Sequence, residues 1–298
     1  MLPWQPEIVV SEELAAALVA GQFPELAGAP IRLLGRGWDY TAYLVGDVWV
    51  FRFPRREIVL PGMAREVAAV PRFADRLPVA VPAATFVGVA GEGFPWPFFG
   101  ARFIPGREPA ELELDDDARS ALARPLARAL RVLHSAAILD TAGELLPDDP
   151  IGRGDMQIRV PQARERAAEL GWELGDELQD ALARAESLPR LAPTVVCHGD
   201  LHVRQLLLDD GRLVGVIDWV DVCRGDPGID LSLVWSFLPL QARADFLDEY
   251  GPVSEESLLR ARVLAVFLNA VLALYGQHES LPAVEREALA GLRRAANP

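Results

Sequence analysis

The sequence predicts an α+β protein of two lobes, with a five-stranded antiparallel sheet in the N-terminal lobe and a mostly helical C-terminal lobe. Three observations indicate this fold. Short apolar runs bounded by turn residues dominate up to residue 104, helical periodicity dominates beyond it, and Pro105-Gly106 lies where the pattern changes. We therefore expect one lobe at 1–104 and a second at 105–298.

The N-terminal lobe should begin with a helix. Ser11 precedes two acidic residues and an apolar run, which indicates an N-capped helix start. A second helix is expected at 61–76, where apolar residues recur with helical spacing. Five strands with one helix after the third are the layout of a small nucleotide-binding lobe. The expected strands are 31–34, 42–45, 48–53, 79–89 and 98–104.

The C-terminal lobe should be helical apart from short strands at 194–197, 205–208 and 213–217, the last two joined by the turn Asp209-Asp210-Gly211. The longest apolar stretch, 263–275, is too short to span a bilayer, so we expect a buried helix there. The expected helices are 115–139, 161–188, 229–236, 242–250, 255–275 and 283–296.

Composition narrows the possible functions. The formal net charge of −14 argues against nucleic acid or an anionic membrane as the main partner, and it is compatible with a cationic small substrate. Cys197 and Cys223 offer no disulfide framework and the N-terminus shows no secretory signal, so we expect a cytoplasmic protein. All 29 basic residues are arginine, which excludes a Walker-A or Schiff-base lysine.

One segment carries most of the chemical information: C-H-G-D-L-H-V-R-Q at 197–205, followed by V-G-V-I-D-W at 214–219. Phosphoryl transfer needs a carboxylate at the acceptor hydroxyl, together with oxygen ligands for magnesium. Asp200 is the candidate for the first role. Gln205, five residues later, and Asp218, which ends an apolar strand, are the candidate metal ligands.

This segment resembles the motif of the aminoglycoside phosphotransferase and choline-kinase-like family, H-G-D-L-H-x-x-N followed by I-D-W or I-D-F. Weaker matches extend from about Ile31 to Leu238. The resemblance implies a protein-kinase-like fold and transfer of phosphate from ATP or GTP, with Mg²⁺, to a hydroxyl of a small molecule. It also implies that Asp200 is the catalytic carboxylate and that Asp218 binds magnesium.

The sequence departs from this family at Gln205, where asparagine is usual. Glutamine keeps the amide oxygen but places it one methylene, roughly 1.5 Å, farther out. We expect metal binding to survive, because magnesium keeps several water ligands in protein sites.

Arg52, in V-W-V-F-R-F-P, takes the position where the family and kinases have the phosphate-binding lysine. Arginine can contact phosphate or carboxylate through two nitrogens, so it is a workable substitute. Glu66 on the following helix is its expected partner. The alternative is a surface ion pair worth at most about 1 kcal/mol.

Two other segments of the first lobe are candidates for nucleotide binding. Gly35 and Gly37, in G-R-G-W-D-Y-T, would cover the nucleotide phosphates through backbone N–H groups. Arg102 and Phe103 mark approximately where backbone groups of the hinge would pair with an adenine or guanine edge.

Structural roles are expected for the other polar residues near the motif. His198 should fix the catalytic loop. Asp221 is close enough to Asp218 in the sequence to touch metal or substrate, but we expect it to be exposed to solvent. Asp226 and Asp230 lie at a helix start, where aspartate is a common cap, and the resemblance implies that they brace the active-site loops. His134 is expected to pack in the core, whereas His202 should either hold the loop or lie near the phosphates.

Functions of different classes remain open. The leading hypothesis is a small-molecule kinase for an aminoglycoside, acting as a monomer or weak dimer in antibiotic resistance. A macrolide, homoserine, amino alcohol or sugar is an alternative acceptor, because the motif specifies the transfer chemistry and not the acceptor. Gln205 and Arg52 suggest a nucleotide-binding protein with little catalysis. His198, Asp200 and His202 suggest a metal-dependent phosphoesterase.

Overall fold

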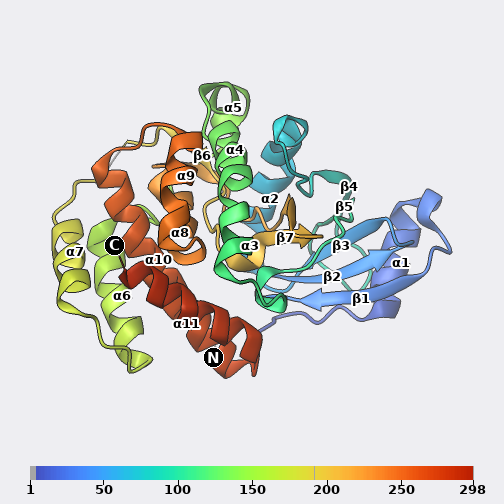
Figure 1. Cartoon of the computed structure of the whole chain (residues 1–298). Coiled ribbons are helices and arrows are strands. Elements are labelled where there is room, and N and C mark those ends of the chain that lie inside the picture. Colours follow the sequence, from blue (N-terminus) through green and yellow to red (C-terminus); the bar gives the residue numbers. More distant parts are fainter. Residues whose placement is uncertain (1–4, 191, 298) are drawn as a thin grey trace. The chain divides into compact units, whose positions relative to one another are not determined.

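The computed structural model describes residues 5–190 and 192–297 (Figure 1). The chain divides into two compact units, Met1–Asp75 with Val81–Ile104, and Arg76–Ala80 with Pro105–Pro298. Residues 76–80, which the sequence analysis assigned to the first lobe, belong to the second unit. Ala80 explains this difference, because it forms a parallel bridge with Gly215.

The first unit is built around a five-stranded sheet with strand order β1-β2-β3-β5-β4, in which every neighbouring pair is antiparallel. Its elements are α1 (Glu12–Gln22), β1 (Ile31–Arg36), β2 (Tyr40–Val45), β3 (Trp49–Pro54), α2 (Leu60–Ala69), β4 (Ala84–Gly88) and β5 (Phe98–Arg102). Ser11 caps α1 by accepting a hydrogen bond from the Leu14 N–H, as predicted. The expected α+β fold with a five-stranded antiparallel sheet is confirmed.

Aromatic side chains fill the core of this unit. Leu18 and Val19 of α1 join Phe51 and Phe98 in one buried cluster. Gly100 leaves room for these rings, since a Cβ there would lie 2.7 Å from the ring of Phe51. The helix α1 thus packs against the sheet, and the two share one hydrophobic core (Figure 1).

Two predictions in the first unit were wrong, each because of a proline. The helix expected at 61–76 ends at Ala69 and is followed by two 3₁₀ turns, since Pro71 has no N–H to continue the helix. The strand expected at 79–89 is reduced to β4. Pro82 has no N–H to donate to a strand ladder.

The second unit is mostly helical and contains two small two-stranded antiparallel sheets. Its helices are α3 (Asp116–Ala121), α4 (Ala123–Leu133), α5 (Ala136–Ala142), α6 (Met156–Glu169), α7 (Asp176–Glu186), α8 (Gly228–Phe237), α9 (Leu240–Tyr250), α10 (Glu255–His278) and α11 (Pro282–Ala296). Its strands pair as β6 (Val195–Cys197) with β9 (Cys223–Gly225) and as β7 (Leu206–Asp209) with β8 (Arg212–Val216). The predicted turn between β7 and β8 is present, with positive φ at Asp210 and Gly211.

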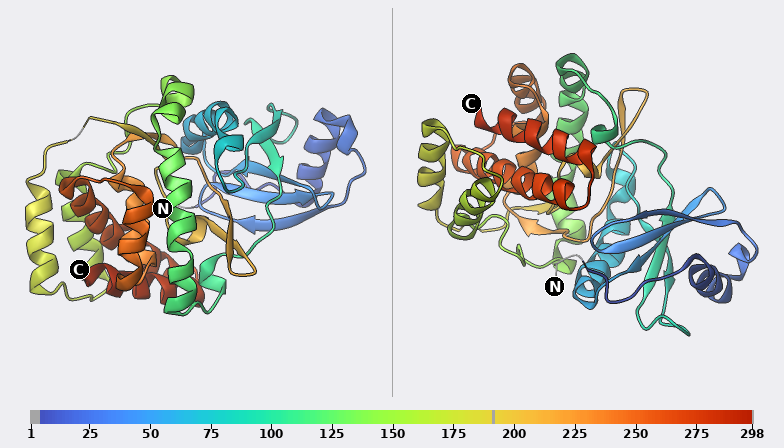
Figure 2. Two further views of the ribbon diagram at one scale, coloured as in Figure 1. Left: turned by 45° about the horizontal axis from the view of Figure 1, so that its top comes forward. Right: turned by 90° about the horizontal axis from the view of Figure 1, so that it is seen from below.

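The long helix α10 forms the centre of this unit. It packs against α6, α8 and α11, and Figure 2 shows α10 and α11 side by side. Within the described residues it is the one helix long and apolar enough to cross a membrane, but 78% of its most apolar window is buried in the folded unit. A helix at the centre of a folded core can be equally long and apolar. The expected buried helix is therefore confirmed, and it ends at His278, three residues later than expected.

Three other predictions in this unit need correction. The helix expected at 115–139 is divided into α3, α4 and α5, because Pro125 interrupts the first part and Ser135 is extended. The helix expected at 161–188 begins earlier, at a cap formed by Asp155, and breaks at Gly171, whose φ is +66°. The strand β9 was not anticipated.

Candidate active site

The H-G-D loop leaves β6 at Cys197 and turns back on itself at Gly199. The φ angle of Gly199 is +92°, and a Cβ at this position would lie 2.1 Å from the carbonyl oxygen of Asp221. Only glycine allows this close approach. The glycine therefore brings the loop that carries Asp200 against the segment that follows Asp218.

Asp230, on the first turn of α8, anchors this loop. Its buried carboxylate accepts hydrogen bonds from the backbone N–H groups of His198 at 2.7 Å and Gly199 at 3.0 Å. Burial acts to raise the pKa of Asp230, but the hydrogen bond from His134 and the backbone N–H of Gly199 hold it below its usual value. The carboxylate is therefore ionised, and it braces the loop as the family resemblance implied.

His198 connects the two halves of the motif. Its Nε2 donates to the carbonyl of Ile217 at 2.9 Å, while its Nδ1 accepts from the backbone N–H of Asp200 at 3.4 Å. Burial lowers the pKa of this imidazole, so it is neutral with its proton on Nε2. Because both nitrogens are engaged, His198 is not a metal ligand here, which argues against the phosphoesterase hypothesis.

Asp200, the predicted catalytic carboxylate, is partly accessible. Its Oδ1 lies 2.6 Å from Nη2 of Arg153, and its side chain is 25% exposed. The same Nη2 lies 3.1 Å from Oδ2 of Asp221, so the guanidinium group joins two carboxylates. Asp221, which was expected to be exposed to solvent, is partly buried in this ion pair.

His202 lies on the other side of Asp200, with Nε2 3.7 Å from the second carboxylate oxygen. Its Nδ1 accepts from the backbone N–H of Arg204 and so caps a short 3₁₀ turn. Burial, followed by the charges of Arg204 and Arg153, lowers the pKa of His202 well below its usual value. The ring is therefore neutral and does not compete with Asp200 as a charged group.

Gln205 closes that 3₁₀ turn, and β7 begins one residue later. Its backbone carbonyl accepts from the N–H of Ile217 at 2.9 Å, which holds it beside the segment leading to Asp218. The side-chain Oε1 is buried and has no hydrogen-bond partner within the described chain. An orphaned amide oxygen of this kind suits a hard cation such as magnesium.

Asp218 lies two residues beyond β8 and has a φ of +68°. Non-glycine residues rarely adopt this conformation, which is concentrated at functional sites. Ile217, the neighbour of Asp218, is hydrogen-bonded to the backbone of Gln205, and a carboxylate and an amide oxygen are both ligands that magnesium accepts. The residues present therefore fit the expected metal.

A different group of three potential metal ligands, His134, Cys197 and Asp230, is buried in the described part of the second unit. Both ring nitrogens of His134 are already engaged, one with the hydroxyl of Tyr250 at 2.7 Å and the other with Asp230 at 3.0 Å. These hydrogen bonds explain the cluster as part of the loop support.

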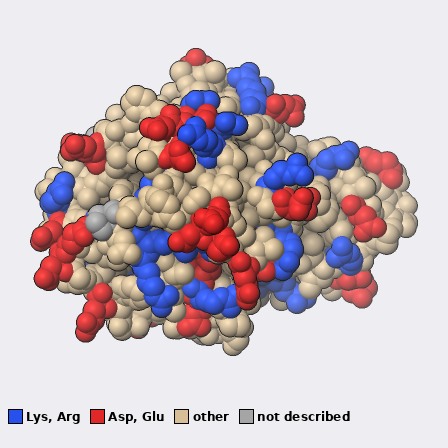
Figure 3. Space-filling view, in the orientation of Figure 1, with Lys and Arg blue, Asp and Glu red and all other residues tan. Residues whose placement is uncertain are grey.

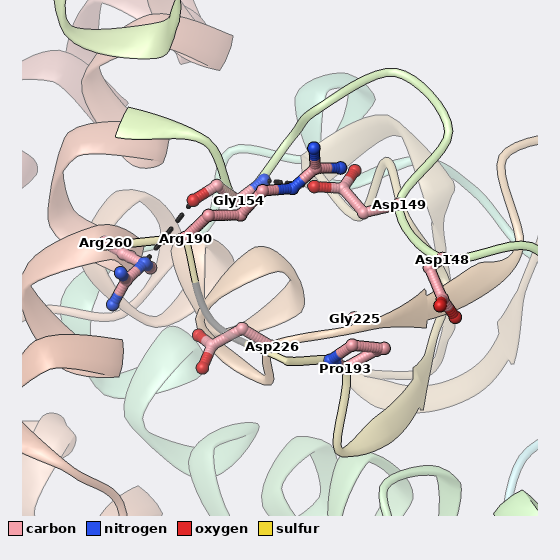
Figure 4. Close-up of a pocket in the computed structure, with 8 residues that line it drawn as sticks. All are labelled: Asp148, Asp149, Gly154, Arg190, Pro193, Gly225, Asp226 and Arg260. Atoms are coloured by element: carbon pink, nitrogen blue, oxygen red, sulfur yellow. Dashed lines mark hydrogen bonds between the residues drawn. The ribbon is translucent and has the colours of Figure 1, made fainter. Parts of the chain in front are cut away.

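Arg153 was missed by sequence reasoning. It lies in the loop before α6, where the carboxylate of Asp149 accepts the backbone N–H groups of Arg153 at 2.6 Å and Gly154 at 2.8 Å. Arg260 of α10 donates to the carbonyl of Gly154 (Figure 4). The Gly-Arg-Gly sequence at 152–154 was the available signal, since glycines on both sides suggest a shaped loop.

These residues border a pocket in the second unit. The acidic side chains around it are engaged: Asp148 with Arg224 at 2.6 Å, and Asp226 with the hydroxyl of Ser257 at 2.8 Å. Two of its lining residues, Asp149 and Arg260, hold the loop that carries Arg153. The pocket is lined by Asp148, Asp149, Gly154, Arg190, Pro193, Gly225, Asp226 and Arg260 (Figure 4).

In the first unit, the expected pairing of Arg52 with Glu66 is present. Nη1 of Arg52 on β3 lies 2.9 Å from Oε1 of Glu66 on α2. Glu66 is 1% exposed, so this is not the surface ion pair considered as the alternative. The guanidinium group also lies over the ring of Tyr40, 4.8 Å from its centroid.

The glycine-bearing loop of the first unit joins β1 and β2. Gly35 has open space where a side chain would project, and neither Gly35 nor Gly37 has a positive φ. The N–H of Gly37 donates to the carbonyl of Tyr40 at 2.9 Å, so this N–H is not one that a phosphate would use. The carbonyl of Gly37 accepts from Arg55, which ties the loop to the end of β3.

The hinge candidates lie at the end of β5. Arg102 is exposed, with its guanidinium 5.6 Å from the ring centroid of Trp49. The backbone N–H of Phe103 donates to the carbonyl of Val48 at 2.7 Å. A purine edge would therefore have to use other backbone groups of this segment.

Comparisons with known proteins agree with this architecture. Among solved structures, the GDP complex of wild-type aminoglycoside 2'-phosphotransferase-IIIa superposes with a TM-score of 0.72 at 23% identity, covering 96% of this chain and 99% of that one. Macrolide 2'-phosphotransferase MphH from Brachybacterium faecium gives a TM-score of 0.62 at 23% identity, covering 96% and 98% of the two chains. These similarities confirm the expected fold.

Sequence comparisons give the family. An aminoglycoside 3'-phosphotransferase of Streptomyces fradiae is 30% identical over 166 residues, which are 52% of this chain and 57% of that relative. The match thus spans little more than half of that protein. Residues 30–264, most of the chain, match the model of the phosphotransferase enzyme family. The chain therefore belongs to the phosphotransferase enzyme family.

Proposed function

We propose that this protein is a nucleotide-dependent small-molecule kinase that transfers the γ-phosphoryl group of ATP or GTP to a hydroxyl of a small acceptor. The observation that carries the proposal is the braced loop of Asp200. Gly199, His198 and Asp230 fix it against the segments of Gln205 and Asp218. Phosphoryl transfer depends on such positioning more than on covalent chemistry.

Asp200 would accept the proton of the acceptor hydroxyl and orient its oxygen for attack. The ionised carboxylate of Asp230 holds the Asp200 loop, and neutral His202 adds no competing charge. Magnesium, held by Gln205 and Asp218, would neutralise charge on the nucleotide phosphates. Arg52, fixed by Glu66, would contact those phosphates, and the open space at Gly35 would let the loop approach them.

An aminoglycoside is the first acceptor to test. Solved structures of similar fold include a GDP and kanamycin complex of APH(2")-IIia and a streptomycin-ATP-APH(2")-IIa ternary complex. The net charge of −14 is compatible with a cationic acceptor. A macrolide is the second acceptor to test, because MphH has a similar fold. The two buried free cysteines, Cys197 and Cys223, support action in the reducing cytoplasm.

The test measures phosphate transfer and nucleotide binding separately. Asp200→Ala should abolish transfer and leave nucleotide affinity nearly unchanged, whereas Asp218→Ala should also weaken binding of the magnesium nucleotide. Arg164→Gln, on α6 and paired with Glu186, serves as a control for surface charge. Transfer that persists in Asp200→Ala would overturn the assigned role. Nucleotide binding without transfer to any acceptor would favour the nucleotide-binding alternative.

A further inference from the structure

The guanidinium group of Arg153 lies between two carboxylates, one of which is the candidate catalytic group Asp200. It is 2.6 Å from Asp200 and 3.1 Å from Asp221, and its side chain is only 13% exposed. Burial acts to lower the pKa of Arg153, but the charges of Asp200 and Asp221 raise it above its usual value. The group is therefore a permanent positive charge beside the candidate catalytic carboxylate.

The loop is built to hold this arginine in place. Asp149 accepts two consecutive N–H groups, at Arg153 and Gly154, from a backbone conformation with a φ of +34°. Arg159 of α6 donates through Nε to the carbonyl of Gly152 at 3.0 Å. Arg260 of α10 donates to the carbonyl of Gly154, so two helices and one carboxylate determine where Arg153 lies.

We propose that Arg153 is a specificity-determining residue that disfavours polycationic acceptors by taking the position beside Asp200 and Asp221 that an ammonium group would need. This inference rests on the proposed kinase function. An amine next to the reacting hydroxyl would gain most from those two carboxylates, yet it would meet a fixed guanidinium group there. Acceptors that carry little or no positive charge near the hydroxyl avoid this repulsion. The inference therefore narrows the proposed function: an aminoglycoside stays the first acceptor to test, but Arg153 should make it a poor one.

Two further observations agree with this assignment. Nε of Arg153 is buried without a hydrogen-bond partner in the described part of the chain, so its position is determined by the carboxylates and not by a full set of hydrogen bonds. Ile151 and Ile158, on either side of it in the sequence, are 46% and 44% exposed. The surface beside Arg153 in the sequence is therefore partly apolar.

The experiment compares kanamycin with its fully N-acetylated form, which keeps the sugar hydroxyls but lacks the positive charges. Binding by calorimetry and kcat/KM for transfer are measured for the wild type, Arg153→Gln, Arg153→Lys and the control Arg164→Gln. Loss of the contact with Asp200 should affect transfer to both acceptors alike, so the ratio of the two acceptors is the readout. In Arg153→Gln the kcat/KM and affinity for kanamycin, each relative to the acetylated form, should rise about tenfold, which corresponds to about 1.4 kcal/mol. Arg153→Lys and Arg164→Gln should keep the wild-type preference.

An unchanged ratio of kanamycin to its acetylated form in Arg153→Gln would overturn the proposal. If Arg153→Gln does not fold, the wild type is tested alone. A wild type that prefers kanamycin over its acetylated form by more than about tenfold would contradict the proposal that Arg153 disfavours polycationic acceptors. Magnesium-nucleotide binding is measured in parallel. A wild type that neither binds nucleotide nor transfers phosphate removes the proposed function, while acceptor binding still tests Arg153.

Discussion

The buried amide of Gln205 links the structure to the proposed metal site at the scale of a single residue. Its Oε1 has no hydrogen-bond partner within the described chain, and the residue is only 6% exposed to solvent. A buried polar atom without a partner costs about 1–3 kcal/mol of stability. Proteins tolerate such a cost where the atom has a function, and binding magnesium is the function proposed here.

Replacing Gln205 by methionine, which has a similar shape, should separate stability from metal binding. Without metal, Gln205→Met should be as stable as the wild type or up to about 1 kcal/mol more stable, because no acceptor is left unpaired. It should lose most of the magnesium dependence of nucleotide binding.

Gln162→Met is the control for this substitution. The amide oxygen of Gln162 accepts a hydrogen bond from Arg159 at 2.7 Å, so its loss should destabilise the protein. A large loss of stability in metal-free Gln205→Met would refute this interpretation. Chemical unfolding and nucleotide titrations with and without magnesium measure both effects.

His202 should make the stability of the protein depend on pH. Its pKa is lowered well below 6.5 by burial, so the folded protein stays neutral at pH values where the unfolded chain takes up a proton. The free energy of unfolding therefore falls as the pH drops below about 6.5, by up to about 1.4 kcal/mol per pH unit for this residue.

His202→Asn should remove this contribution, because asparagine can still cap the N–H of Arg204 but does not titrate. Relative to the wild type, the variant should gain stability steadily from pH 6.5 to 5.5 in urea unfolding experiments. The exposed His278 provides the matched control, His278→Asn. A stability difference between the wild type and His202→Asn that is independent of pH would show that His202 titrates normally in the folded protein.

Sequence alone predicted some residue contacts and missed others for a physical reason. Arg52 and Glu66 could be paired because one was expected on a strand and the other on the next helix, as the family resemblance implied. Arg153 could not be connected with Asp200, because that contact depends on how the loop before α6 folds over α10. No local pattern encodes such a tertiary contact.

At the scale of elements, α8 determines the geometry of the loop that carries Asp200. Asp230 on this helix accepts the N–H groups of His198 and Gly199 and contacts His134, all of them buried. The catalytic loop has little regular structure of its own, so its shape depends on this carboxylate. Asp230 is therefore a positioning residue that acts on Asp200 through the backbone.

Asp230→Asn should reduce both stability and transfer. The amide offers one acceptor oxygen where the carboxylate offers two, so a buried N–H loses its partner at a cost of about 3 kcal/mol. Transfer should fall much more than nucleotide affinity. Ser236→Ala on the same helix removes a hydroxyl that donates to the carbonyl of Ser232 and should change stability by less than about 0.5 kcal/mol. If Asp230→Asn is as stable and active as the wild type, the helix does not position the loop. Thermal unfolding and steady-state kinetics check both variants.

Elements bounded by clear turn residues could be predicted from the sequence. Elements that end at a proline were predicted to be longer than they are. The strands around the turn Asp210-Gly211 were found because positive φ is favoured at both positions. The helix from 61 and the strand from 79 were drawn too long because Pro71 and Pro82 lack the N–H that a helix or ladder requires. The short β9 has only three residues and exists through its pairing with β6.

At the scale of the whole molecule, the candidate residues are divided between the two compact units. Arg52 and Glu66 belong to the first unit, whereas Asp200, Gln205 and Asp218 belong to the second. Acidic and basic side chains are interspersed on the face drawn in Figure 3, so the net charge of −14 is not gathered into one patch on that face. The class of reaction follows from the motif, but the acceptor depends on residues such as Arg153 that are assembled only in the fold.

Binding of magnesium nucleotide to the folded protein should raise its thermal stability. At about 100 times its Kd, a ligand that binds only the folded state adds about 2.7 kcal/mol, or roughly 5 °C in Tm for a chain of this size. We expect magnesium nucleotide to raise the Tm of the wild type and of Asp200→Ala by this amount, and to raise it much less in Arg52→Gln and Asp218→Asn. Each variant is compared with its own nucleotide-free Tm, because Arg52→Gln also weakens the contact with buried Glu66. Arg164→Gln should behave as the wild type. A full shift in Arg52→Gln would mean that the first unit does not hold the phosphates through this arginine, whereas a full shift in Asp218→Asn would remove the proposed metal ligand.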